Sequence, residues 1–213
     1  MEFARLLEIV GDEPIFETGL LLAGNVNPKD VRRQLSRWAK AGKLYQLRRG
    51  VYALAPPYQK VTPHPFLVAN YLVRSSYVSN QSALAYYGLI PEYVPAVTSV
   101  TTLRPRQWET LWGHYQFRHI KAEFFNDYRL VEVANIQQAF VATPEKSLLD
   151  LIYLHPGADS PEYLRELRLQ NLEQLNFEQL QKLADFFNSP KLQRAISVVK
   201  QLVQEEEQDY EIL

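Results

Sequence analysis

The chain of 213 residues contains no cysteine, and it has only eight glycines. Without cysteine there are no disulfides, no thiolate metal sites and no cysteine nucleophile. The glycines are scattered, and no two of them have the spacing of a dinucleotide-binding or P-loop cradle. We therefore expect neither thiol chemistry nor a loop that binds nucleotide phosphates.

Long hydrophobic runs are also missing, although 46% of the residues are hydrophobic. No run approaches the roughly 18–20 apolar residues that a membrane-spanning helix needs. The start, MEFARLLEIVGDE, lacks the basic residues followed by an apolar block that mark a secretory signal. We expect a globular cytoplasmic protein with no membrane partner, large enough for one large domain or two small ones.

Catalytic patterns are scarce. No histidine pair has the i, i+4 spacing of a metalloprotease helix, and His114 and His119 would point to opposite faces of a strand. No serine stands in a G-x-S-x-G elbow. Glu145, Lys146 and Asp150 could form a catalytic group, but helix-capping charge and an i, i+4 ion pair also explain them. We predict that the protein is not an enzyme and binds no cofactor or metal.

Charge is unevenly distributed, although the formal net charge is only −1. Residues 1–55 carry nine Lys/Arg against six Asp/Glu, whereas residues 56–213 carry 14 against 18. Residues 28–54 hold eight basic side chains and a single acid, Asp30. Such a local excess of positive charge is typical of a surface that binds a polyanion.

Residues 28–41 are predicted to form a helix with a basic face. Asn27 is a suitable N-cap, and Pro28 fits the first helical position. Val31, Leu35 and Trp38 share one side at 100° per residue. The opposite side collects the polar residues that we expect to contact DNA: Lys29, Arg32, Arg33, Ser36, Arg37 and Lys40.

The basic helix is followed by KLYQLRRGVYAL, which predicts a β-hairpin at residues 43–54. Gly50 supplies the positive φ of a tight turn, so that Arg48 and Arg49 lie at or beside its tip. Two helices are expected earlier, at residues 2–10 and 15–23. This order predicts a winged helix-turn-helix domain over residues 1–55, with the basic helix in the major groove of duplex DNA and the hairpin at a flanking phosphate or the minor groove. An ordinary solvated basic face is the alternative.

The rest of the chain predicts a larger α+β domain at 66–213, after a Pro-rich linker at 56–65. Two helices are expected first, and a central sheet and C-terminal helices follow. The expected strands are residues 77–79, 97–103, 114–120, 128–134 and 138–142. The expected helices are residues 64–74 and 80–87, and those that begin after Thr143, Ser160, Asn176 and Ser189. Residues 204–213 form an acidic tail.

Two further features are candidates for binding a partner. Arg104 and Arg106 flank a proline after a strand, and this stiff loop suits a phosphate or an acidic partner, or else lies in solvent. Tyr86 and Tyr87 belong to a tyrosine-rich stretch, residues 82–95, which suits an interface or a core helix with its exit turn.

Three stretches resemble the AbiEi family of antitoxins from type IV toxin–antitoxin (abortive infection) systems. They are LRRGVYAL at 47–54, SALAYYGLIP at 82–91 and ATPEKSLLDLIY at 142–153. The resemblance implies an N-terminal winged helix that binds promoter inverted repeats and represses transcription, and a second domain that neutralises a nucleotidyltransferase-like toxin. It assigns DNA contacts to Lys29, Arg32, Arg33, Arg37, Arg48 and Arg49.

Two alternatives stay open beside the repressor and antitoxin. The second domain could instead oligomerise or sense a ligand, in a stand-alone transcriptional regulator. An enzyme is the other alternative, with Glu145, Asp150 and the four histidines as candidates. Regulators of this shape often bind palindromes in pairs, but no heptad seam indicates whether this chain forms a homodimer on DNA.

Overall fold

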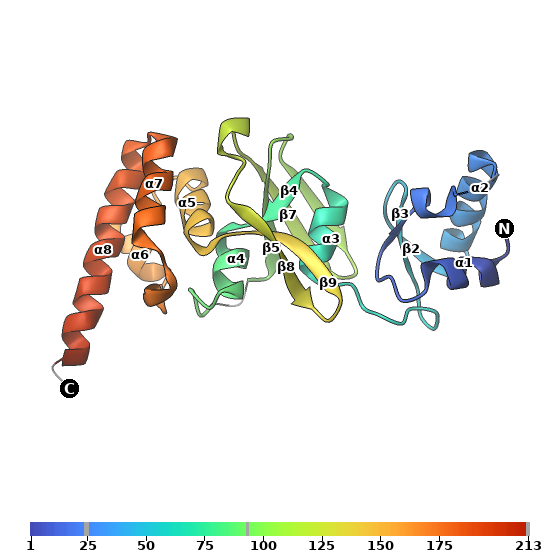
Figure 1. Cartoon of the computed structure of the whole chain (residues 1–213), viewed down its shortest axis with the longest axis horizontal. Coiled ribbons are helices and arrows are strands. Elements are labelled where there is room, and N and C mark those ends of the chain that lie inside the picture. The colour runs from blue at the N-terminus through green and yellow to red at the C-terminus, as the bar shows by residue number, and fades with distance from the viewer. Residues whose placement is uncertain (24–25, 93, 212–213) are drawn as a thin grey trace.

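The computed structural model describes residues 1–23, 26–92 and 94–211, and it is an α+β structure, as predicted. Three parts follow one another along the longest axis of the molecule (Figure 1): an N-terminal part with a small sheet, a central six-stranded sheet, and a group of C-terminal helices. The two ends of the chain lie at opposite ends of this row.

The N-terminal part contains two helices, a 3-10 turn and a three-stranded sheet of order β1-β3-β2. Its elements are α1 (Phe3–Val10), β1 (Phe16–Glu17), η1 (Thr18–Leu21), α2 (Pro28–Lys40), β2 (Leu44–Arg48) and β3 (Val51–Leu54). The helices predicted at 2–10 and 28–41 and the hairpin at 43–54 are confirmed. Asn27 caps α2, because its side-chain oxygen accepts a hydrogen bond of 2.9 Å from the amide of Lys29.

The helix predicted at residues 15–23 is wrong. Residues 16–17 form a strand that pairs antiparallel with β3, so that Phe16 lies opposite Tyr52, and only a single 3-10 turn follows. Ile15 and Phe16 are both 2% exposed, but they pack in two different clusters, as neighbours on a strand do. Strand pairing and burial on two sides therefore outweigh the apolar composition that favoured a helix.

The central sheet is mixed and has the order β6-β7-β5-β4-β9-β8. Its strands are β4 (Ser76–Val78), β5 (Ala96–Thr101), β6 (Arg106–Thr110), β7 (Gly113–His119), β8 (Tyr128–Ala134) and β9 (Gln137–Ala142). The β5–β7 and β4–β9 pairs are parallel, and the other pairs are antiparallel. The sequence did not predict β6, which forms one edge of the sheet.

Helices cover both faces of this sheet (Figure 1). Val68 and Ala69 of α3 (Pro65–Leu72) are buried against one face, together with Tyr115 and Phe117 of β7. The other face packs on α5 (Pro144–Leu154). Helix α4 (Asn80–Tyr86) comes before α5 in the chain. Further elements complete the C-terminal side: η2 (Ala122–Phe124), α6 (Pro161–Glu166), η3 (Leu172–Gln174), α7 (Phe177–Phe187) and α8 (Pro190–Glu211).

The small N-terminal sheet packs directly against α3. Leu47, Val51 and Ala53 of the hairpin are buried in the same cluster as Val68 and Leu72. These side chains exclude water between the N-terminal and central parts. Burial of apolar surface on both sides fixes the orientation of α2 relative to the central sheet.

Candidate nucleic-acid interface

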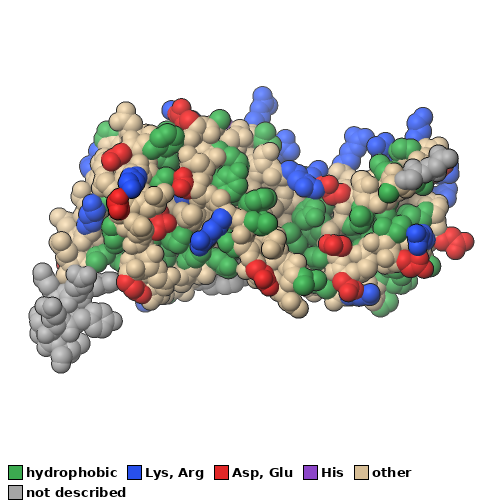
Figure 2. Space-filling model, in the orientation of Figure 1, with side chains coloured by type: hydrophobic (Ala, Val, Ile, Leu, Met, Phe, Trp, Pro, Cys, Tyr) green, Lys and Arg blue, Asp and Glu red, His purple; other side chains and the backbone are tan. Residues whose placement is uncertain are grey.

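The polar face of α2 lies in solvent. All six of its predicted DNA-contacting residues are exposed: Lys29, Arg32, Arg33, Ser36, Arg37 and Lys40. Figure 2 shows Lys and Arg side chains along the upper edge of the N-terminal part, whereas its lower side carries Asp and Glu together with some Lys and Arg. Five of the six exposed residues are basic, and this concentrates positive potential on the surface that α2 presents.

Only one acid lies on α2. Arg33 donates a hydrogen bond of 3.0 Å to Asp30, and both side chains are more than half exposed. An exposed pair at i, i+3 is worth little because water and salt screen it. Arg33 can therefore exchange this carboxylate for a phosphate at small cost.

The opposite side of α2 holds the helix in place. Val31 and Leu35 are 2% and 0% exposed, and they pack in the N-terminal core with Leu6. Trp38 packs edge to face on Phe3, with 5.2 Å between the ring centroids. Helical periodicity thus divides α2 into a buried apolar side and a basic side that is open to a ligand.

The two arginines at the hairpin have different environments. Arg49 is exposed at the turn. Arg48 donates a 2.6 Å hydrogen bond from Nε to the carbonyl of Tyr71, and its guanidinium lies 3.6 Å from Glu17. With a side chain only 29% exposed, Arg48 joins the hairpin to α3. We therefore assign Arg48 to this internal contact and retain Arg49 as the candidate DNA contact.

The sequence did not identify Glu17 and Tyr71 as the partners of Arg48. Glu17 also accepts a 2.5 Å contact from Arg74, so that one carboxylate bridges two guanidiniums. Glu17 and Arg74 are 57 residues apart in the sequence, so no local pattern reveals that they pair. Trp112, which packs edge to face on Tyr45 of β2, was missed for the same reason.

The candidate partner-binding residues lie in separate places. Arg104 and Arg106 are exposed, and Arg106 begins β6 rather than standing in a loop. Tyr87 is half-buried and donates a 2.9 Å hydrogen bond to the carbonyl of Ala142, which ties α4 to the sheet. Tyr86 is 40% exposed.

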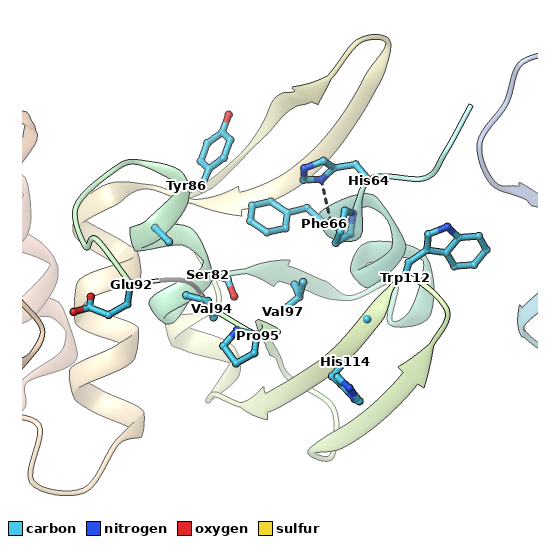
Figure 3. A pocket seen from close by; sticks show the side chains of 13 residues that line it. His64, Phe66, Ser82, Tyr86, Glu92, Val94, Pro95, Val97, Trp112 and His114 are labelled. Atoms are coloured by element: carbon cyan, nitrogen blue, oxygen red, sulfur yellow. Dashed lines mark hydrogen bonds between the residues drawn. The ribbon is translucent and has the colours of Figure 1, made fainter. Parts of the chain in front are cut away.

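Tyr86 borders a cavity of about 370 Å³ on the central part. Figure 3 shows Phe66, Ser82 and Val97 around this cavity, whereas the side chains of Trp112 and Glu92 point away from it in opposite directions. The carboxylate of Glu92 thus does not reach into the cavity.

Lys146 and Asp150 form an ion pair in the core, both 0% exposed. Lys146 also donates a 2.8 Å hydrogen bond to the hydroxyl of Tyr77, and Asp150 accepts one of 2.8 Å from Ser79. Burial raises the pKa of Asp150, and the Lys146 charge opposes this rise. Glu145 accepts a 2.8 Å bond from the amide of Asn176. Lys146 and Asp150 are thus closed off from solvent, whereas Glu145 is 7% exposed.

Among the residues whose side chains the structure describes, 1–23, 26–92 and 94–205, no three His, Asp or Glu side chains are arranged to hold a metal ion. Within the described residues 1–23, 26–92 and 94–211, no helix is both long and apolar enough to cross a membrane. A scan against models of protein families finds no match to the chain, and a search of curated proteins finds none either.

Proposed function

We propose that this chain binds duplex DNA through α2 and regulates transcription. The observation that carries the proposal is the division of α2 into a buried side anchored by Val31 and Leu35 and an exposed side with five basic residues. A B-DNA major groove about 12 Å wide accepts a helix in this way. The basic side chains would then contact phosphates and base edges on either side of the helix.

The surrounding elements support a winged helix-turn-helix reading of residues 1–55. The order is helix, short strand, 3-10 turn, helix and hairpin, and β1 pairs with β3 in the small sheet. In this reading η1 occupies the position of the second helix, α2 is the recognition helix, and Arg49 at the hairpin turn contacts a flanking phosphate.

The biological role in this proposal comes from the resemblance to AbiEi antitoxins. The chain would repress its own promoter at inverted repeats, as a cytoplasmic protein, and its central and C-terminal parts would neutralise a nucleotidyltransferase-like toxin. Co-expression with the product of a neighbouring nucleotidyltransferase-like gene tests the antitoxin role. A toxin that stays lethal in the presence of this protein rules it out and leaves DNA binding unaffected.

A ligand-sensing regulator is a second candidate, favoured by one contact. Trp112 borders the cavity and packs on Tyr45 of the hairpin, with 5.7 Å between the ring centroids. A ligand in the cavity would therefore act next to the proposed DNA-binding part. Absence of a toxin-like neighbouring gene would favour this candidate over the antitoxin.

The DNA proposal is tested by changing the exposed side of α2 alone. We expect Arg32→Ala with Arg37→Ala to weaken binding to the upstream DNA by at least about tenfold and to relax sequence preference, measured by fluorescence anisotropy. The matched control is Arg165→Ala with Lys182→Ala, which removes two exposed charges from the C-terminal helices. Equal binding by both variants and the unaltered protein would contradict the proposal.

A further inference from the structure

The cavity of about 370 Å³ on the central part has mostly apolar walls. Figure 3 shows Phe66 of α3 on one side of it, and Val94, Pro95 and Val97 on the other. Sites for small molecules have volumes of about 300–1,000 Å³ and are lined mainly by apolar and aromatic side chains. The volume of this cavity lies at the lower end of that range and suits a molecule of one or two rings.

Aromatic rings gather at one wall of the cavity. Phe66 lies edge to face on His64, with 5.1 Å between the ring centroids, and its ring is tilted against that of Tyr86 at 5.8 Å. All three residues line the cavity, and none of them is fully buried by the protein. Aromatic rings attract one another in edge-to-face and offset-stacked arrangements. A planar aromatic ligand can therefore add a further ring to this cluster.

The charges of the described lining residues are kept out of the cavity. The carboxylate of Glu92 points away, and the side chain of His114 is 64% exposed. Burial lowers the pKa of His64, whose Nδ1 accepts a 3.2 Å hydrogen bond from the amide of Phe66, so this ring is neutral near pH 7. A charged ligand would lose its hydration here without gaining an opposite charge, which favours an uncharged one.

The hydroxyl of Ser82 is occupied by the protein itself. It donates a 3.2 Å hydrogen bond to the carbonyl of Ala96 and accepts one of 2.9 Å from the amide of Thr98. Ser82 therefore fixes the start of β5 beside the cavity, and the ligand has to be held chiefly by apolar and aromatic contacts.

One wall of the cavity also supports the N-terminal part. Phe66 belongs to α3, and Val68 and Leu72 of the same helix are buried together with Leu47 and Val51 of the hairpin. A ligand in contact with Phe66 thus touches the helix on which the hairpin is packed.

The turn between β6 and β7 makes a second connection to the hairpin. Trp112 borders the cavity, but its indole points away from it and packs on Tyr45 of β2, with 5.7 Å between the ring centroids. A ligand can shift a conformational equilibrium only through contacts that differ between the two states. Both elements that hold the hairpin border the cavity, and so can supply such contacts.

We propose that this cavity binds a small uncharged aromatic molecule, and that binding changes the affinity of the N-terminal part for DNA. The site itself is independent of the proposed DNA-binding function, whereas its regulatory effect rests on that function. The ligand would be an effector of the regulator.

The charge preference is tested with two probes that share one ring system, 2-naphthol and 2-naphthoate, by isothermal titration calorimetry of the full-length protein at pH 7. We expect 2-naphthol to bind at one site with a dissociation constant of about 100 µM or lower. The anion 2-naphthoate should bind at least about tenfold more weakly. Equal binding of the two probes, or no binding of 2-naphthol, would overturn the proposed site.

The location is tested by filling the cavity. Ala85→Phe and Val97→Phe each place a ring in the cavity wall, and each should weaken 2-naphthol binding at least about tenfold. The control, Ala122→Phe, adds the same ring at an exposed position of η2 and should leave binding unchanged. Circular dichroism checks that each variant is folded. If neither filled variant folds, Phe66→Leu, which removes the ring from the wall, takes their place. Unchanged binding by the folded cavity variants would show that 2-naphthol binds elsewhere.

The regulatory effect is measured as the DNA affinity with and without saturating 2-naphthol. We expect a change of about fivefold or more, and saturating DNA should change the affinity for 2-naphthol by the same factor, because coupling between two sites is reciprocal. Tyr45→Leu removes the contact with Trp112 and should at least halve this factor without weakening 2-naphthol binding.

The outcomes separate this inference from the function on which its second half rests. If the protein binds 2-naphthol in the cavity but binds no DNA, the DNA-binding function is wrong and the regulatory half falls with it, while the site stands. If it binds both and neither affects the affinity for the other by as much as about twofold, the regulatory half alone is wrong.

Discussion

Replacing Lys146 by methionine removes the cation from the buried ion pair and keeps most of the side-chain volume. Asp150 would then remain 0% exposed with hydrogen bonds from Ser79 (2.8 Å) and Tyr77 (3.0 Å) but without an opposite charge. Removal of one partner from a buried pair costs about 3–5 kcal/mol, because the remaining charge is desolvated without compensation. We expect Lys146→Met to lower the free energy of unfolding by this amount at pH 7.5.

Protonation of Asp150 sets an independent upper limit on the loss in free energy of unfolding. Burial already raises the pKa of Asp150, and loss of the Lys146 charge raises it further. The folded variant can then bind a proton that the unfolded chain, with an ordinary Asp pKa of about 4, releases. At about 1.36 kcal/mol per pH unit, keeping this carboxyl neutral costs at most about 5 kcal/mol at pH 7.5 and about 1.4 kcal/mol at pH 5.

The raised pKa of Asp150 decides how the loss of stability in Lys146→Met changes with pH. A carboxyl whose pKa is raised on folding makes no unfavourable contribution below about pH 4, and its cost grows as the pH rises towards the folded-state pKa. We therefore expect the stability difference between Lys146→Met and the unaltered protein to be smaller at pH 5 than at pH 7.5. Urea unfolding followed by circular dichroism at both pH values measures it.

A matched control exists on α7. Lys182 and Glu178 also form an i, i+4 pair, at 2.6 Å, but both side chains are more than 60% exposed. Lys182→Met should change stability little, because water screens an exposed pair. A loss below about 1 kcal/mol for Lys146→Met at pH 7.5, or a loss that is equal at both pH values, would refute the reasoning about the buried pair.

Two further changes test how the DNA-binding part is built. Asn27→Ala removes the acceptor for the amide of Lys29 and should cost about 1 kcal/mol in urea unfolding; an unchanged midpoint would show that this cap contributes nothing. Gly50→Ala places a side chain on a residue with φ of 83°, a backbone conformation that disfavours it. The nearest atom to the new Cβ is 3.6 Å away, so there is no clash. The backbone conformation alone should therefore lower the free energy of unfolding by about 1–2 kcal/mol. Gly19→Ala is its control, since no atom lies within 4 Å of the added Cβ, and an equal loss in both variants would contradict this explanation.

The helices that carry the proposed function were predictable because their signals are local. In α2, the Asn27 cap, Pro28 and the spacing of Val31 and Leu35 lie within nine residues of one another. Thr143, Ser160 and Asn176 similarly cap their helices through side-chain bonds to nearby amides. Such features act within one or two helical turns, so the sequence alone displays them.

Features that depend on distant partners were not predictable. The strand at Phe16–Glu17 exists because β3 pairs with it, some 35 residues further along the chain. Four of the five residues of β6 are polar or charged, and Trp108 lies in the middle, as suits an edge strand with one solvated side. Pairing with β7 holds this strand in the sheet. The contacts of Arg48 with Glu17 and Tyr71 likewise require the fold to be known.

The central claim is that the basic side of α2 binds duplex DNA, and the salt dependence of binding tests it most directly. The affinity of the full-length protein for the DNA upstream of its gene should be measured between 50 and 200 mM salt. Each neutralised phosphate contributes about −0.9 to the slope of log K against log salt, so contacts from four or five basic side chains predict a slope of about −4. Binding that is equal at the two ends of this range would contradict the claim.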